Sequence, residues 1–98
     1  KVGLYRPSTG QWFLDRNGDR SWDGCRRDLC ISEFGTAEDL PVTGDWNGAG
    51  RSKIGVFRPQ TGEWLLDLNG NNQWDGCGID LCLTDFGDVG DIPVAGKW

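Results

Sequence analysis

Residues 3–25 read GLYRPSTGQWFLDRNGDRSWDGC, and residues 55–77 read GVFRPQTGEWLLDLNGNNQWDGC. The two stretches align at a shift of 52 residues, and over the 46 residue pairs that this shift aligns, 25 are identical. Every tryptophan and every cysteine has its counterpart at this shift. A period of this size is typical of propellers, solenoids and stacked arrays, in which each unit buries an apolar face against a neighbour. The chain therefore divides into unit 1, residues 1–52, and unit 2, residues 53–98.

Each unit is expected to form four short β-strands. Apolar residues recur at the period of a strand, and clusters of Gly, Pro, Asn and Asp separate the runs. No window shows the periodicity of a helix. The expected strands are Val2–Arg6, Gln11–Asp15, Leu29–Phe34 and Leu40–Trp46 in unit 1, and Ile54–Arg58, Glu63–Asp67, Leu81–Phe86 and Ile92–Lys97 in unit 2. This pattern predicts an all-β fold of two four-stranded, blade-like repeats, belonging to a β-propeller-like ring or to an open stacked array.

The composition limits the partners of the chain. Its 98 residues are 37% hydrophobic and include 16 glycines, so a small core needs additional staples such as disulfides, metal ions or neighbouring subunits. The net charge is −5 and no basic stripe is present, which argues against nucleic acid as a partner. No segment approaches the roughly 20 apolar residues of a membrane span. The absence of methionine leads us to expect a mature product or an excerpt of a longer chain.

The cysteines predict an oxidising location. Cys25 and Cys30 are separated by four residues, and Cys77 and Cys82 repeat this spacing. Such pairs in a short, acidic, Gly-rich chain favour disulfides and an extracellular or cell-surface protein. Pairing within each repeat would make each unit self-contained and contribute about 2 kcal/mol. A disulfide ladder between the units remains open, and a zinc site of four thiolates is the less favoured alternative.

A loop rich in oxygen-bearing side chains follows the second expected strand of each unit. In the loop 15–23, alternate positions from one to nine carry Asp15, Asn17, Asp19, Ser21 and Asp23, and in the loop 67–75 they carry Asp67, Asn69, Asn71, Gln73 and Asp75. Ca²⁺ binds about six to eight oxygen ligands of these types. We therefore predict a calcium site in each loop, although Asn-Gly and Asp also form plain turns. Asp28 and Asp80, five residues beyond position nine, are candidates for a further carboxylate at each site.

A third copy of this pattern lies between the units, in residues 45–53. It keeps Asp45 and Asn47 at positions one and three, but it has Ala49 at five and Lys53 at nine. An ammonium at a ligand position repels a metal ion. The sequence therefore predicts a metal-free turn, with residues 47–52 linking one unit to the next.

With these strands and loops assigned, the chain resembles the FG-GAP repeats of integrin-α-type β-propellers and their bacterial relatives. The matching residues are Phe34-Gly35, Phe86-Gly87, Asp39-Leu40-Pro41-Val42, Asp91-Ile92-Pro93-Val94 and Gly44-Asp45-Trp46-Asn47-Gly48. The resemblance implies a calcium loop of Asp and Asn ligands, an extracellular location and a non-enzymatic adhesive or scaffolding role. In two respects the chain departs from the family. The family's calcium loop usually follows the Gly-Asp-Trp strand, where this chain has Lys53, and the family does not usually carry the cysteine pair.

The expected function is that of a non-enzymatic extracellular structural module, stabilised by calcium and disulfides. It would assemble with other copies of itself, or with further repeats of a longer chain, for cell-surface scaffolding or adhesion. The alternative is a lectin-like module that binds surface glycans through the exposed rings of Trp22 and Trp74, while Trp12 and Trp64 belong to the core and Trp46 and Trp98 pack between blades. An enzyme is not expected, because histidine is absent and the acidic residues are accounted for as calcium ligands.

Overall fold

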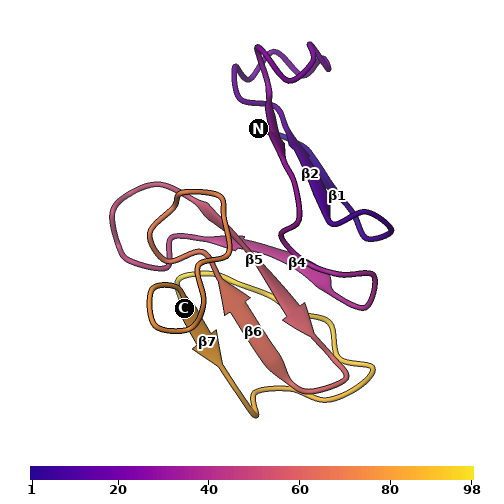
Figure 1. Ribbon diagram of the computed structural model, residues 1–98. Helices are drawn as coiled ribbons and strands as arrows, with labels where there is room; N and C mark the ends of the chain where they lie inside the picture. Colours follow the sequence, from indigo (N-terminus) through magenta and orange to yellow (C-terminus); the bar gives the residue numbers. More distant parts are fainter.

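The computed structural model describes residues 1–98 and consists of β-strands and connecting loops, with no helix. The strands form two antiparallel sheets, one of three strands in the order β1-β2-β3 and one of four in the order β4-β5-β6-β7 (Figure 1). Their bounds are β1 Gly3–Arg6, β2 Gln11–Leu14, β3 Leu29–Ile31, β4 Leu40–Gly44, β5 Lys53–Arg58, β6 Glu63–Leu66 and β7 Leu81–Leu83. The predicted all-β class is confirmed, and seven of the eight expected strands form.

The sheets divide the chain at a different place from the sequence repeat. β4 belongs to unit 1, but it pairs with β5, the first strand of unit 2, from Leu40 opposite Phe57 to Gly44 opposite Lys53. Residues 47–52 lie in the connection of this antiparallel hairpin, as predicted for the linker. The expectation that each unit forms its own four-stranded sheet is therefore wrong. The fourth strand of unit 1, β4, belongs to the sheet of unit 2, because it pairs with β5.

The eighth expected strand does not form. Residues 92–97 are the counterpart of β4, but in the structure they pair with no other strand. An isolated extended segment has no ladder of backbone hydrogen bonds to stabilise it. The prediction of a strand at Ile92–Lys97 is therefore wrong for the chain by itself.

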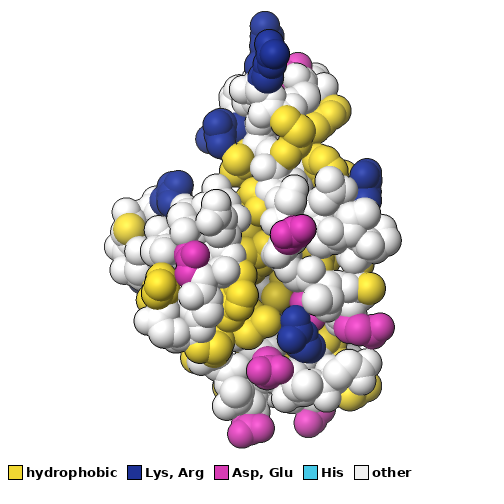
Figure 2. All heavy atoms as spheres, viewed as in Figure 1, with side chains coloured by type: hydrophobic (Ala, Val, Ile, Leu, Met, Phe, Trp, Pro, Cys, Tyr) yellow, Lys and Arg dark blue, Asp and Glu magenta, His cyan; other side chains and the backbone are white.

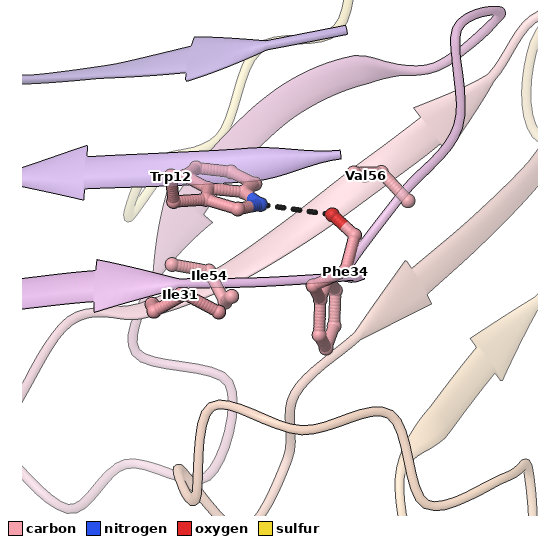
Figure 3. Packing of buried hydrophobic residues seen from close by; sticks show 5 residues of the cluster. All are labelled: Trp12, Ile31, Phe34, Ile54 and Val56. Atoms are coloured by element: carbon pink, nitrogen blue, oxygen red, sulfur yellow. Dashed lines mark hydrogen bonds between the residues drawn. The ribbon is translucent and has the colours of Figure 1, made fainter. Parts of the chain in front are cut away.

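The core lies between the two sheets. Trp12 of β2 and Ile31 of β3 pack with Phe34 against Ile54 and Val56 of β5 (Figure 3). The indole Nε1 of Trp12 donates a hydrogen bond of 2.9 Å to the carbonyl oxygen of Phe34, so the only polar atom of this ring is satisfied inside the core. Each unit thus buries one face against the other, which is the behaviour expected of neighbouring repeats.

The corresponding face of unit 2 has no sheet packed upon it. Phe34 is 1% exposed, whereas its counterpart Phe86 is 75% exposed. Trp12 is buried as predicted, whereas Trp64 is only partly buried, although both indoles donate to the equivalent carbonyl oxygen. The same residues therefore form a core in one unit and a surface in the other, because only unit 1 has a neighbour on this side.

This difference gives a matched pair of substitutions. Phe34→Ala should destabilise the fold by about 3–5 kcal/mol, because it leaves a cavity between the sheets. Phe86→Ala, the counterpart on the exposed face, should change the free energy of unfolding by less than about 1 kcal/mol in dilute solution. Urea unfolding followed by tryptophan fluorescence measures both values. Equal losses for the two variants would contradict the position of the core.

Candidate functional site

The first aspartate of each predicted calcium loop organises the backbone of that loop. Asp15 follows β2 directly, and its two carboxylate oxygens accept hydrogen bonds from the backbone N–H groups of Gly18 and Arg20, at 3.1 and 2.9 Å. Asp67 follows β6 and accepts from Gly70 and Asn72 at 3.2 and 2.9 Å. Both carboxylates are buried. The position-one side chain of each loop therefore shapes the turn around itself.

A second buried aspartate connects the two ends of each loop through hydrogen bonds. One Asp28 carboxylate oxygen accepts from the backbone N–H of Arg16 at 3.1 Å, and the other accepts from that of Asp23 at 2.8 Å. In the same way, the carboxylate oxygens of Asp80 accept from the backbone N–H groups of Leu68 and Asp75, at 3.1 and 2.8 Å. Each of these carboxylates thus ties the first residues of the loop to the last. Asp28 and Asp80 act in the structure as braces for the backbone, and their role as further metal ligands stays a prediction.

The remaining polar positions of the first loop form a chain of short-range contacts. The side-chain oxygen of Asn17 accepts from the backbone N–H of Asp19 at 3.2 Å, and the carboxylate of Asp19 accepts from that of Ser21 at 2.9 Å. The amide nitrogen of Asn17 donates to the carboxylate of Asp23 at 3.2 Å. Positions three, five and nine are thereby linked by their side chains, and position seven joins them through its backbone N–H, whereas the hydroxyl of Ser21 makes no hydrogen bond.

The second loop repeats this arrangement, but it has an amide at position five, where the first loop has a carboxylate. Asn71 stands where Asp19 stands in unit 1, and its amide nitrogen donates to Asp75 at 2.6 Å. Asn69 donates to the same carboxylate at 3.3 Å. The Gln73 side chain makes no hydrogen bond, as for Ser21 in the first loop. No group of three or more Asp, Glu, Cys or His side chains in the structure is arranged to hold a metal ion. The calcium ligand set therefore stays a prediction.

The second loop holds two carboxylates close together in a buried position. Burial raises the pKa of Asp67 above its ordinary value, and the neighbouring carboxylate of Asp80 raises it further. Hydrogen bonds from the backbone N–H groups of Asn72 and Gly70 act in the opposite direction but do not cancel the shift. A pair of like charges out of water favours either a proton or a cation at its side. The Asp80 carboxylate is therefore close enough to Asp67 to favour the protonated form of that residue.

The third loop contains a cation of its own. Lys53 is 4% exposed, and its ammonium donates to the side-chain oxygens of Asp45 and Asn47 at 3.0 and 2.6 Å and to the carbonyl oxygen of Arg51 at 3.0 Å. These groups stand at positions one, three and seven. A hydrogen bond from Gly50 and the ammonium of Lys53 lower the pKa of Asp45. The ammonium was predicted only to repel an ion, but it occupies the centre of the loop.

All three loops share two backbone contacts. The N–H at position five donates to the side-chain oxygen of the Asn at position three, at 3.2 Å in each of the first two loops and 3.1 Å in the third. The N–H at position six donates to the position-one carboxylate from Arg20, Asn72 and Gly50, at 2.9, 2.9 and 2.7 Å. The loops therefore share a local scaffold, although only the third contains a lysine. Arg51 also reaches the second loop, where its guanidinium donates to the carbonyl oxygen of Gly70 at 2.9 Å.

Both disulfides lie within a repeat, as predicted. Cys25 is bonded to Cys30 and Cys77 to Cys82, and no free cysteine remains. Cys30 and Cys82 lie on β3 and β7, so each bridge fastens the end of a loop to a strand of its own sheet. The zinc and ladder alternatives are thereby excluded in this structure. Two disulfides in a chain of this size are typical of an oxidising compartment.

The tryptophans of the two loops differ in their surroundings. Trp74 lies edge-on against Phe34, with ring centroids 6.0 Å apart, and so contacts the core between the units. Trp22 lies edge-on against Phe13 at 5.5 Å and is 55% exposed. Trp46 donates to the carbonyl oxygen of Ile54 at 2.9 Å, which joins the end of unit 1 to the start of unit 2. Glycan binding by these rings stays a prediction.

Comparison of the chain with protein-family models, with curated proteins and with solved structures finds no match. The resemblance to FG-GAP repeats therefore stays a prediction from the residues quoted above. The structure has no helix long and apolar enough to cross a membrane.

The role of the buried ammonium can be tested with a matched pair. Lys53→Met keeps an apolar stem of similar length but leaves the oxygens of Asp45 and Asn47 without their donor. We expect the melting temperature to fall by roughly 5 °C or more. Lys1→Met changes the exposed counterpart of Lys53, which makes no hydrogen bond, and should leave the melting temperature unchanged. Differential scanning calorimetry that finds equal melting temperatures for the two variants would refute the assigned role.

Proposed function

We propose that this chain is a non-enzymatic, extracellular structural repeat module whose units join by sharing a β-sheet. The observation that carries the proposal is the pairing of β4, from unit 1, with β5, from unit 2. A joint of this kind links successive units through backbone hydrogen bonds as well as through apolar packing. Such units form a propeller ring or a fibre when repeated, which suits scaffolding or adhesion at a cell surface.

The acidic residues fit a structural role better than a catalytic one. Every buried side-chain nitrogen or oxygen has a hydrogen-bond partner, and the carboxylates of Asp15, Asp28, Asp67 and Asp80 are occupied by backbone N–H groups. These four carboxylates therefore have an evident structural function, since they hold the loops in place. The disulfides support the extracellular part of the proposal, since they form in oxidising compartments.

We further propose that the loops 15–23 and 67–75 bind Ca²⁺. The support comes from the third loop, in which the Lys53 ammonium is bound by the oxygens at positions one, three and seven. The other two loops keep Asp and Asn at positions one and three, but carry Asp at position nine in place of Lys. In the loop 45–53 the chain supplies the cation itself, through Lys53 at position nine. Where position nine is acidic, the positive charge has to come from solution, and a hard divalent cation suits the oxygen donors.

The two calcium sites are proposed to differ in affinity. The first loop offers the carboxylates of Asp15, Asp19 and Asp23, whereas the second has Asn71 in the place of Asp19. Carboxylate count is a main determinant of calcium affinity. Arg51, bound to the carbonyl oxygen of Gly70, also places a positive charge beside the second loop. Arg16 and Arg20 offset part of the advantage of the first loop, because they lie next to its ligands in sequence.

Isothermal titration calorimetry should find two calcium ions bound per chain. Binding to the folded state alone stabilises it by about 2.7 kcal/mol when the free ion is at 100 times its Kd, so chelation should lower the melting temperature. Replacing both Asp15 and Asp23 by Asn should cost more of this stabilisation than replacing both Asp67 and Asp75. Asp45→Asn, in the loop that contains Lys53, should leave the stoichiometry at two. Melting that is insensitive to both calcium and chelator would leave these loops as plain turns.

Calcium binding to the second loop should be linked to proton release. The pKa of Asp67 is raised in the folded state, chiefly by burial, so stability contributed by its protonated form is present at low pH and is lost as the pH rises through the raised value. Calcium competes with this proton, and its affinity for the loop should therefore fall as the pH is lowered from 7 to about 4. Calorimetry in two buffers of different ionisation enthalpy measures the protons released. Asp67→Asn should reduce their number, and unchanged release in this variant would contradict the linkage.

A further inference from the structure

We propose that the segment Asp91–Trp98 of one copy pairs as an added β-strand with β1 of a second copy of this chain, so that copies stack head to tail. The inference rests on the proposed function, because it names the partner and the register of the assembly. It follows from the joint inside the chain, where β4 lies on the edge of β5. Each end of the chain carries one unpaired half of that joint.

The first half is the free edge of β1. This strand pairs with β2 on one side only, whereas its counterpart β5 lies between β4 and β6. A hollow of about 970 Å³ opens beside β1, lined by Lys1–Tyr5 on one side and by Pro41–Thr43 of β4 on the other. Figure 2 shows hydrophobic side chains gathered in the middle of the face that it draws. An edge strand with apolar side chains beside an open hollow is a template for pairing with another strand.

The second half is the segment that follows β7. Residues 92–96 correspond to β4 and share its Pro, Val and Gly, but they lie along the second sheet without a ladder, in yellow in Figure 1. Val94 is 69% exposed, whereas its counterpart Val42, inside the β4–β5 pair, is 5% exposed. The segment therefore has the sequence of a paired strand and lacks only its partner.

The internal joint fixes the register of the proposed one. Moving the β4–β5 pairs by 52 residues on each strand gives the expected partners across the two copies. They are Ile92 with Tyr5, Pro93 with Leu4, Val94 with Gly3, Ala95 with Val2 and Gly96 with Lys1. A shift by one residue would turn the apolar side chains of the segment to the opposite face, so this register is strongly specified.

Pairing also brings two exposed apolar faces together. Val2 is 62% exposed, whereas its counterpart Ile54 is 3% exposed in the core between the units. In the stacked pair, Val2 and Leu4 of the second copy would pack on Trp64 and Phe86 of the first, as Ile54 and Val56 pack on Trp12 and Phe34. The exposed large hydrophobic residues at both ends are therefore the missing members of one repeated core.

Two polar contacts of the internal joint have unpaired equivalents. The guanidinium of Arg58 donates to the carboxylate of Asp39 at 2.8 and 3.1 Å. Their counterparts are Arg6, which lies over the ring of Phe13, and Asp91, whose second carboxylate oxygen makes no hydrogen bond. Similarly, Trp46 donates to the carbonyl oxygen of Ile54, whereas the exposed Trp98 has no acceptor in this chain, and its counterpart acceptor would be the carbonyl oxygen of Val2.

One charged contact of the internal joint is not reproduced between copies. Lys97 stands where Asp45 stands, so it would face Lys1 in place of the Asp45–Lys53 ion pair at 3.0 Å. The joint between copies should therefore be weaker than the joint inside the chain, and Lys97→Asp should strengthen it.

The decisive experiment is a charge exchange followed by sedimentation velocity in calcium-containing buffer. Asp91→Arg and Arg6→Asp should each weaken self-association of the chain by at least about tenfold, because each places like charges in the joint. An equimolar mixture of the two variants should associate as the wild type does, since every joint between unlike chains restores an opposite pair. Val94→Asp should weaken association to a similar degree. Val89→Asp, at an exposed position outside the joint, should not.

Each result separates the proposal from its alternatives. A mixture that associates no better than its components would overturn the assigned register, and wild-type association unaffected by any of these variants would place the contact elsewhere while leaving the assembly proposal standing. A wild-type chain that stays monomeric at all concentrations would overturn both. Calcium stoichiometry is measured separately, so failure of the loops and failure of the joint remain distinguishable. Tighter association of Lys97→Asp into species of defined size would support the register, because this change places an opposite charge beside Lys1.

Discussion

The pairing of β4 with β5 is the interaction on which the rest of the structure depends. It places β5 inside a sheet instead of at its edge, and it brings Ile54 and Val56 under the face of the first sheet. β5 is consequently buried over most of its length, whereas β1, with a closely similar sequence, is mostly exposed. Burial in this chain is therefore decided less by the residues of a strand than by whether a neighbouring strand covers them. A repeat unit on its own has an incomplete sheet and half a core.

Sharing a strand changes how two units can separate. If each unit kept its own four strands, the units would be held together only by side-chain packing between faces. With β4 donated across the boundary, separation also breaks the ladder from Leu40 to Gly44 and exposes backbone groups that need partners. The ion pair between Asp39 and Arg58 reinforces the same boundary, and one of its members is buried. The boundary between units is thus a strongly connected part of the fold.

Much of the local structure could be predicted from the sequence, because strand alternation, turn residues and cysteine spacing are local signals. The partition of strands between sheets could not be predicted. In a tandem repeat of four strands, the sequence pattern is the same wherever one sheet ends and the next begins. Only the contacts of Leu40–Gly44 show which neighbour it joins. Asp28 and Asp80 were found by their recurrence, but their function as braces depends on N–H groups that sequence does not place. The charge of Lys53 taken alone predicts only repulsion of an ion, whereas its long side chain and the oxygens at positions one, three and seven together indicate an internal cation.

Under the calcium proposal, the three loops represent one scaffold with two sources of positive charge. The Lys53 ammonium is covalently attached, so the loop at the boundary between units cannot lose its cation to a chelator. Ions in the loops 15–23 and 67–75 would be exchangeable, and these loops lie within units, each beside a disulfide that keeps the chain from unravelling. Under the calcium proposal, removal of the ion should therefore loosen the interior of each unit while the shared sheet between them persists. A permanent cation at the boundary and removable ones elsewhere would let the stiffness of an array respond to calcium without the array coming apart.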